Sequence, residues 1–351
     1  MKTLRRDAGF TLVEVMIAMV IGMATVVAVL QIYAHGRELY RVSERVARVQ
    51  EQARVAFAMI EPDVEMAGYY GFTQSAQVIR FARGASPDVT LATSADMRQF
   101  PMRAGGPPPP PVASLPAGAH ACGTNFAVDV SMPLQASNNT FALGPLRKPA
   151  CDPYQRREQP GADTLTTRRV ETRFSAPEAN RLQIYASRNT GLSSHVLFAD
   201  GNAPGTVDAN HRVQNLVVRT YYVARDSVGQ RDFPALRVKA LTRSGVNVVF
   251  DEDEVMSGVE DLQVQLGIAA AGAQDGRAAR YVDPDHVDVP WAQVVAVRVW
   301  LRVRADLPEP AFTDSRTYRY ADVTYTPAGA ESHYRRVLLA RTVTLRNARL
   351  T

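Results

Sequence analysis

An apolar run begins with Gly9-Phe10-Thr11-Leu12-Val13-Glu14 and continues to about Ala34 of this 351-residue chain. Glu14 is the only charged residue within the run, and three basic residues precede it, namely Lys2, Arg5 and Arg6. The run is long enough to span a bilayer, which takes about 20 residues in helical form. A carboxylate inside such a helix costs several kcal/mol unless it has a partner, so Glu14 is a candidate functional residue.

This order of features resembles the class III signal of type IV pilins and of the pseudopilins of type II secretion. The resemblance implies that a prepilin peptidase cleaves after Gly9 and that the new terminal residue, Phe10, becomes N-methylated. It also implies that Glu14 neutralises the α-amine of a neighbouring subunit when helices bundle in a fibre. Two charges that are unfavourable in lipid would thereby form one ion pair at a subunit interface.

Three other interpretations explain the run less well. An ordinary secretory signal has an uncharged apolar region of about 7–15 residues and a small-x-small cleavage site, whereas Glu14 interrupts this run and no such site follows Leu30. A plain membrane anchor leaves Glu14 unexplained. A buried helix of a soluble protein is rarely apolar on every side.

The helix is expected to continue beyond the membrane. Apolar residues recur at spacings of three and four, which indicates one apolar stripe; they are Leu39, Val42, Val46, Val49, Ala53, Ala56 and Ile60. Pro62 is expected to follow the end of this pattern. We therefore expect a leader at 1–9, a transmembrane helix at 10–34, an amphipathic continuation at 35–61 and a globular domain at 62–351. A free-standing coiled coil is the alternative for the stripe, although the heptads are few.

The basic leader sets the orientation, because basic residues that flank a spanning helix stay cytoplasmic. We expect an inner-membrane protein with everything after about His35 in the periplasm, a compartment that permits disulfides. The only two cysteines, Cys122 and Cys151, are predicted to pair with each other, with free thiols as the alternative. A loop of this size would be stabilised by about 3–4 kcal/mol. The surrounding Pro- and Gly-rich segment, 86–160, is expected to be an irregular surface loop pinned by this pair.

From about Asp163 onward, short β-branched or aromatic segments bounded by Gly, Asn, Asp or Pro predict strands. The clearest is Val294–Arg304, where apolar residues alternate with Arg and Trp, so one face is expected in the core and the other in water. The remaining expected strands are Thr164 to Val170, Arg181 to Ala186, Val213 to Val223, Ala235 to Leu241, Val246 to Phe250, Val259 to Leu266, Thr317 to Tyr325 and Val337 to Asn347. The predicted fold class is α+β, with the long helix packed on an antiparallel β-sheet domain that contains a long irregular insertion.

The composition gives no sign of catalysis. The formal net charge is +5, but the arginines occur as scattered pairs, so nucleic acid is not an expected partner. No nucleophile elbow, zinc-binding, Walker or dinucleotide motif is present, and no cofactor is expected. The run Asp251-Glu252-Asp253-Glu254 lacks the spacing of a calcium loop; it is expected to form an acidic hairpin turn, and no metal site is predicted. The sequence therefore favours a non-enzymatic structural subunit.

Several segments resemble one pilin family, the minor pilin PilW. They are, in chain order, Ala67-Gly68-Tyr69, Gly161-Ala162-Asp163-Thr164-Leu165, Gly258-Val259-Glu260-Asp261-Leu262-Gln263-Val264, Trp291 with Val294-Val295-Ala296-Val297-Arg298-Val299, Arg335-Arg336-Val337 and Thr342-Val343-Thr344-Leu345-Arg346-Asn347. The segment 86–160 matches nothing specific. The resemblance implies the type IV pilin fold and a low-abundance pilin that helps initiate pilus assembly, in a minor-pilin complex at the fibre tip, in support of twitching motility and adhesion.

The partners that this resemblance implies are the prepilin peptidase, the other minor pilins and the major pilin through the N-terminal helix, the inner-membrane assembly platform and a tip adhesin. Two alternative functions stay open. One is a pseudopilin of a type II secretion system, similar to GspJ, which shares the architecture. The other is a membrane-anchored periplasmic binding module for DNA uptake or adhesin presentation.

Overall fold

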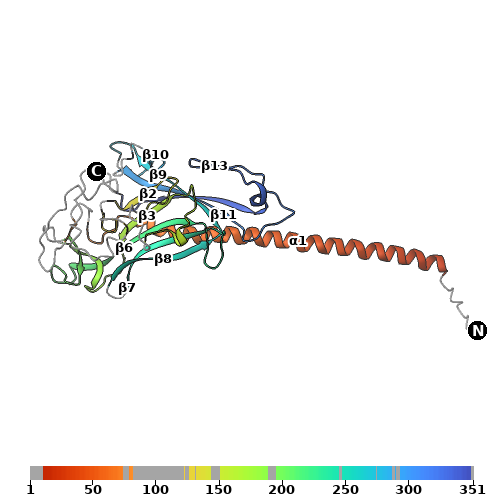
Figure 1. Ribbon diagram of the computed structural model, residues 1–351, viewed down its shortest axis with the longest axis horizontal. Coiled ribbons are helices and arrows are strands. Elements are labelled where there is room, and N and C mark those ends of the chain that lie inside the picture. Colours follow the sequence, from red (N-terminus) through yellow and green to blue (C-terminus); the bar gives the residue numbers. More distant parts are fainter. Residues whose placement is uncertain are drawn as a thin grey trace, which may run out of the picture. The chain divides into compact units, whose positions relative to one another are not determined.

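The computed structural model describes residues 11–73, 79–81, 122, 126–130, 132–143, 151–188, 195–244, 247–273, 275–286, 289 and 293–348. Gly9, Phe10 and most of the segment 86–160 therefore lie outside the described residues, as does Trp291. The chain divides into two compact units, Met1–Arg48 and Val49–Thr351. Helix α1 spans Leu12–Glu65 and contributes to both units (Figure 1). The expected boundary at residue 62 differs from this division, because the last turns of α1 are buried in the core of the second unit.

Pro62 lies inside α1 rather than beyond its end, so the expectation that it marks the end of the helix is wrong. Proline lacks an N–H group and usually breaks a helix interior. Here the last turns are held by other bonds: the Tyr221 hydroxyl donates to the carbonyl of Met59 at 2.9 Å, and the N–H of Met66 donates to the carbonyl of Pro62 at 3.1 Å. Tertiary contacts thus extend the helix past a residue that would end it locally.

The described strands form two larger sheets and one hairpin. The first sheet has the order β1-β5-β4-β6-β3-β2, with β7 paired to β6 and β8 to β7. Its strands are β1 (Arg80–Phe81), β2 (Leu134–Ser137), β3 (Thr164–Val170), β4 (Ala179–Ser187), β5 (His195–Asp200), β6 (His211–Ala224), β7 (Ala235–Ser244) and β8 (Asn247–Ser257). All its pairings are antiparallel except that of β1 with β5.

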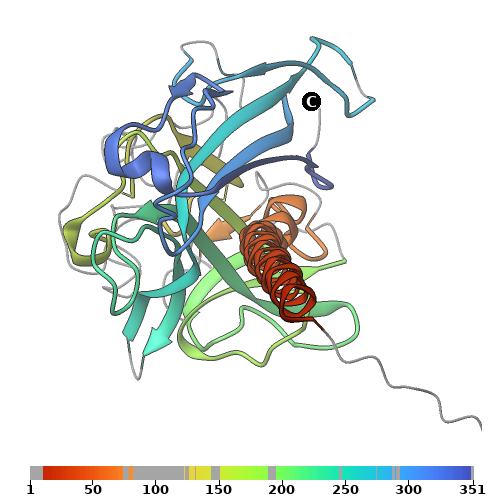
Figure 2. The ribbon, with the colours of Figure 1, turned by 90° about the vertical axis from the view of Figure 1, so that its right-hand side faces the viewer.

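The second sheet is antiparallel throughout, in the order β10-β9-β11-β14. Its strands are β9 (Val259–Ala269), β10 (Ala278–Val282), β11 (Val294–Arg304) and β14 (Arg336–Thr344), and the hairpin pairs β12 (Tyr318–Tyr320) with β13 (Val323–Tyr325). Figure 2 separates the cyan and blue strands of this sheet from the green strands of the first. The α+β class is confirmed; the sequence did not predict β1, β2, β5 and β10, nor the split into two sheets.

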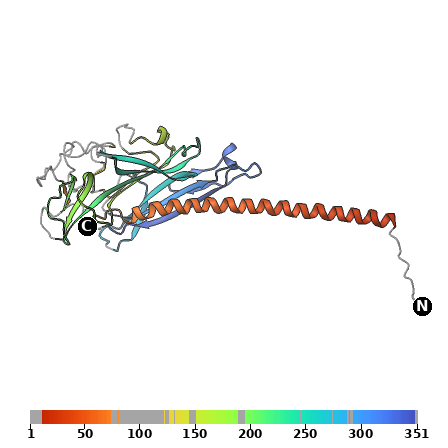
Figure 3. The same ribbon diagram turned by 90° about the horizontal axis from the view of Figure 1, so that it is seen from below.

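The main core lies where the end of α1 meets both sheets. Ala53, Ala56, Ile60 and Val64 of the helix are fully buried in one cluster with apolar residues of β3, β6, β7, β9 and β11. Figure 3 shows the end of α1 beside the strands of the domain. These helix residues recur at spacings of three and four, as the apolar stripe predicted. Packing of this stripe on the sheets is therefore the main link between helix and domain.

Asp163 joins the two sheets at one edge. Its N–H donates to the carbonyl of Leu262 at 2.8 Å, and its carboxylate accepts the N–H groups of Val264 at 2.7 Å and Asn139 at 2.7 Å. Burial raises the pKa of this carboxyl to about 8, because removal from water disfavours the charged form. A carboxyl group with a raised pKa, that of Asp163, therefore lies at the junction of β2, β3 and β9.

The outward face of β11 is only half exposed, which corrects the expectation that it would be wet. Arg302 and Arg304 are buried, because the hairpin β12–β13 and the 3₁₀ turn at Gly329–His333 cover this end of the sheet. Arg302 lies over the ring of Tyr325, with its guanidinium carbon 3.7 Å from the ring centroid. The sequence predicted one strand and a long loop between β11 and β14. In the structure this segment covers the buried side chains of Arg302 and Arg304.

The acidic run 251–254 lies within β8, not in a hairpin turn. Its residues alternate: Asp251 and Asp253 are exposed, whereas the carboxylates of Glu252 and Glu254 turn toward β7. Glu252 pairs with Lys239 at 3.5 Å and Glu254 with Arg237 at 3.1 Å. The run is a strand because each glutamate has a buried cation opposite it in the ladder.

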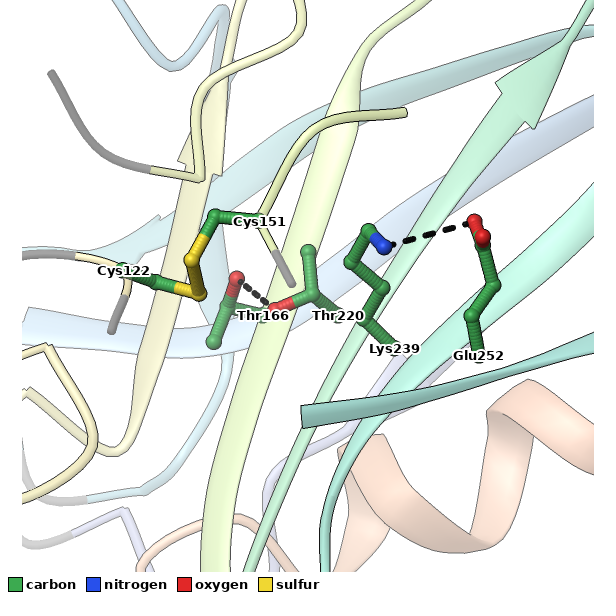
Figure 4. Close-up of a disulfide and its surroundings, with 6 residues drawn as sticks. All are labelled: Cys122, Cys151, Thr166, Thr220, Lys239 and Glu252. Carbon is green, nitrogen blue, oxygen red and sulfur yellow. Dashed lines mark hydrogen bonds and ion pairs between the residues drawn. A yellow bond between two sulfur atoms is a disulfide. The ribbon is translucent and has the colours of Figure 1, made fainter. Parts of the chain in front are cut away.

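Cys122 and Cys151 form the predicted disulfide, with an S–S distance of 2.06 Å. Both cysteines are buried and belong to a second apolar cluster, so this part of the 86–160 segment is core rather than surface loop. Figure 4 shows the disulfide beside a polar row in which Thr166, Thr220 and Lys239 stand opposite one another across β3, β6 and β7. The bridge therefore joins two buried positions that are 29 residues apart in the sequence.

Candidate functional site

Glu14 lies in the first turn of α1, where it closes a capping box with Thr11. The Glu14 carboxylate accepts the N–H of Thr11 at 2.9 Å and the Thr11 hydroxyl at 3.0 Å, while the N–H of Glu14 donates to the Thr11 hydroxyl oxygen at 3.3 Å. These bonds satisfy two backbone donors that have no partner within the helix. The same oxygen, Oε2, accepts both bonds from Thr11, and the negative charge sits at the favourable end of the helix dipole.

The part of α1 from Leu12 to Ala34 is mainly apolar, with Glu14 as its only charged residue, and is not packed against the rest of the described chain. Every residue from Thr11 to Arg37 is exposed. The helix contains a stretch long and apolar enough to cross a membrane, and none of that stretch is buried in protein. An apolar helix that is exposed on all sides needs lipid or other helices around it. Glu14 is thus the one charge on a surface that must be removed from water.

A second, shorter apolar stripe is exposed on α1 in the second unit. Val55 is 39% exposed and Met59 is 45% exposed, and the exposed residues Ala58 and Pro62 continue the same face. This stripe lies opposite the buried one that packs on the sheets. Because residues at spacings of three and four share one helix face, the four side chains present a continuous surface that another helix can contact.

Asp63 holds the end of α1 on the first sheet. Its side chain is 2% exposed, and its carboxylate accepts bonds from Arg169 at 2.9 Å, Arg219 at 3.0 Å and the Tyr221 hydroxyl at 2.6 Å. The buried carboxylate is thus surrounded by three donors from β3 and β6. A buried charge with full hydrogen bonding fixes a geometry even where its net stabilisation is small, so the position of the helix end on the sheet is specified.

A buried ion cluster on the second sheet also holds the 3₁₀ turn at Gly329–His333. Glu260 of β9 accepts bonds from Arg302 at 3.0 Å and from Arg336 at 2.8 Å, and Arg304 pairs with Glu331 at 2.7 Å. Glu260 and Arg336 belong to two of the segments that resemble PilW. The fold brings these distant segments into one ion pair, which gives a physical reason for their joint presence.

Across the described ranges, no group of three or more His, Cys, Asp or Glu side chains could hold a metal ion. The described residues form a helix with an apolar first part and one charge at its start, whose last turns pack on the sheets of the domain. An exposed apolar helix of this kind can pack with like helices.

Two family models match the chain. Residues 220–347 match the model described as Type IV Pilus-assembly protein W, and residues 4–30 match the prokaryotic N-terminal methylation motif. The C-terminal part of the chain is therefore similar to the PilW family, and its N-terminal segment carries the methylation motif. The methylation motif at residues 4–30 overlaps the start of the exposed apolar part of α1.

The chain was also compared with solved structures and with curated proteins. Among solved structures, the chain is similar to a type IV-like pilin, TTHA1219 from Thermus thermophilus, with 16% sequence identity and a TM-score of 0.26 over 56% of this chain and 81% of that chain. No curated protein matches it.

The predicted site residues have different outcomes. Gly9 and Phe10, the expected cleavage and methylation positions, lie outside the described residues and stay predictions. Glu14 is described, but no second subunit is present to test its pairing. The sequence analysis overlooked Thr11, although the spacing Thr-x-x-Glu is itself a sign of a capping box. It also overlooked Asp63, whose partners lie over 100 residues away and leave no local signal.

Proposed function

We propose that this chain is a minor pilin that helps initiate type IV pilus assembly, in a minor-pilin complex at the fibre tip, and so supports twitching motility and adhesion. Prepilin peptidase cleaves after Gly9 and Phe10 is methylated. The helix at 10–34 sits in the inner membrane with the leader in the cytoplasm and the domain in the periplasm. The observation that best supports this proposal is Glu14, the single charge on a helix whose apolar surface is exposed throughout.

In this proposal, Glu14 receives the α-amine of a neighbouring pilin. The carboxylate is held at the helix start by Thr11 but is not surrounded by protein. A cation arriving from another subunit would neutralise it in a medium of low dielectric constant, where an ion pair is far stronger than in water. The second exposed stripe, with Val55 and Met59, supports contact with the helices of other minor pilins and the major pilin.

The charge and the cap can be separated by two substitutions. Glu14→Gln removes the charge but keeps an oxygen that can accept the Thr11 bonds, whereas Thr11→Val removes the hydroxyl but keeps the charge. If the charge drives assembly, Glu14→Gln as the only copy abolishes surface pili while Thr11→Val keeps them, with both proteins found in the membrane. The opposite pattern would show that the residue acts through helix capping alone.

Processing needs its own test, because failed cleavage would also prevent assembly, independently of the charge on Glu14. A Gly9→Val variant is expected to accumulate in the inner membrane as the full-length precursor. Detection of cleaved and methylated Gly9→Val protein by mass spectrometry would contradict the assignment of Gly9 to the cleavage site. Interaction with the peptidase and the assembly platform is part of this proposal.

A second candidate is a pseudopilin of a type II secretion system, since the same helix and charge would serve that assembly. Deletion of the gene, scored for surface pili, twitching and secreted enzymes, distinguishes the two. Lost pili with normal secretion supports the pilus proposal, and lost secretion with normal pili supports the pseudopilin. A third candidate, an anchored binding module, predicts that exchange of residues 1–34 for an unrelated membrane anchor preserves function.

A further inference from the structure

Two arginines and two phenylalanines that are distant in sequence lie in a row on the second unit, with the two rings in the middle and one arginine at each end. The guanidinium carbon of Arg188 lies 4.7 Å from the ring centroid of Phe72, the rings of Phe72 and Phe174 are 6.0 Å apart, and the guanidinium carbon of Arg212 lies 4.7 Å from the ring centroid of Phe174. We call these four residues the Arg–Phe stack. They come from the turn after α1, the β3–β4 connection, the end of β4 and the start of β6.

The positive charge of the Arg–Phe stack is not balanced within the part of the chain that the structure describes. Neither Arg188 nor Arg212 forms an ion pair there, and the Nε atom of Arg212 is buried without a hydrogen-bond partner. The carboxylates nearest to the stack in sequence are already bonded: Glu171 to Arg181, and Asp208 to His211.

Arginines elsewhere in the domain behave differently. Arg157, Arg169 and Arg302 each pair with a buried carboxylate at 2.9 to 3.0 Å. The two arginines of the stack, with ten N–H groups between them by the count of five per guanidinium, therefore lack the carboxylate partner that these three arginines have. Uncompensated guanidinium groups on a surface attract an anion.

The rings of the stack are also unusually placed. Phe174 is 51% exposed, and Arg188 is exposed as well. A phenyl ring exposed beside guanidinium planes offers flat surfaces on which another planar group can stack. A partner that fits both features must combine planar rings with regularly spaced negative charges.

We propose that the Arg–Phe stack binds single-stranded nucleic acid. Bases stack on Phe174 and on the guanidinium planes, and backbone phosphates pair with Arg188 and Arg212. Single strands fit better than duplexes, because a duplex keeps its base faces stacked on one another and offers only its phosphates. The proposal is independent of the pilus function, since none of the four residues belongs to α1.

The test uses the full chain in a neutral detergent and a fluorescein-labelled oligothymidylate, with binding followed by fluorescence anisotropy. Replacing one stacking aromatic residue by alanine is expected to weaken binding by on the order of 5- to 150-fold, so Phe174→Ala should do so and Phe174→Trp should restore binding. Val228→Ala, at a side chain that is 64% exposed elsewhere in the domain, is the matched control and should bind like the parent.

A second pair of variants tests the phosphate contacts. Arg212→Gln is expected to reduce the slope of log affinity against log salt by about 0.7, as for one lost phosphate contact on a single strand. Arg231→Gln, at an 80% exposed side chain, should leave the slope unchanged. The proposal is overturned if the parent does not bind oligothymidylate, or if Phe174→Ala and Val228→Ala bind equally. It is also overturned if polyglutamate binds with the same dependence on Phe174, because the surface would then serve an acidic protein segment.

Discussion

Replacement of Asp63 by asparagine tests how α1 is held on the domain. Asparagine has the same shape, so Asp63→Asn removes a charge without leaving a cavity. In the structure the carboxylate bonds to Arg169, Arg219 and Tyr221, and its own side chain is 2% exposed. The variant therefore leaves two guanidinium groups without their counterion at the interface of helix and sheet.

The size of the effect follows from the exposure of the two arginines. Breaking a fully buried ion pair by removing one partner costs about 3–5 kcal/mol, because the remaining charge is uncompensated. The Arg169 side chain is 16% exposed and that of Arg219 is 35% exposed, so both can regain some hydration. We therefore expect a loss of about 2–4 kcal/mol in the free energy of unfolding, which corresponds to a fall in Tm of roughly 4–8 °C for a domain of this size.

The assay is thermal unfolding of the full chain in detergent, followed by circular dichroism in the β-sheet region. The matched control is Glu61→Gln, two residues away on the same helix. Glu61 pairs with Arg341 at 3.6 Å, with side chains that are 37% and 59% exposed. Such a surface pair contributes about 0–1 kcal/mol, so the control should shift Tm by no more than about 2 °C.

Equal Tm values for Asp63→Asn and Glu61→Gln would refute the reasoning, because burial would then make no difference to the pair. The double variant with Arg219→Gln adds a second check. Removing both partners should cost less than the sum of the two single changes, since coupled residues show interaction energies of about 0.5–3 kcal/mol. Additive losses would mean that Asp63 and Arg219 do not interact in solution.

Three further predictions follow from the same domain. Replacing both cysteines by alanine should lower the free energy of unfolding by about 2–5 kcal/mol. Denaturant unfolding under oxidising conditions measures this loss, and an unchanged midpoint would contradict a stabilising role of the disulfide. Asp163 has its pKa raised to about 8 by burial, so the proton that it holds when folded is lost on unfolding above about pH 4. Stability should therefore fall as the pH rises from about 4 to 8, and Asp163→Asn should flatten this dependence in Tm measurements at both ends of the range; an equally steep slope would argue against a protonated Asp163. Gly258 has φ +82° and an added Cβ would lie 2.8 Å from the carbonyl oxygen of Arg304, whereas Gly272 has φ +76° and open space around it. Gly258→Ala should lower Tm clearly more than Gly272→Ala, and equal shifts would show that backbone strain alone explains both.

The local patterns of the sequence predicted the elements because each pattern depends on near neighbours. The apolar run and its single glutamate specify a helix that must leave water, and the spacing of three and four specifies the stripe that packs on the sheets. Alternation in β11 located that strand with its observed bounds, Val294–Arg304. The weakly patterned strands β1 and β10 were missed, because their few residues gain stability only from the strands beside them.

Tertiary structure decided which charges meet. Alternation in β11 could not show that Arg302 would be buried under Tyr325, since the cover comes from a hairpin further along the chain. The acidic run 251–254 looked like a turn until the register with β7 gave Glu252 and Glu254 their buried cations.

The N-terminal helix and its charge were thus determined by the sequence alone, because membrane insertion depends on the composition of one continuous segment. Only the folded domain determined the partners of Asp63, the ion pair of Glu260 with Arg336 and the Arg–Phe stack. Each of these brings together residues that are distant in the chain, and their meeting depends on strand order and register. No local pattern contains that information, because register is fixed by the packing of whole sheets against the helix.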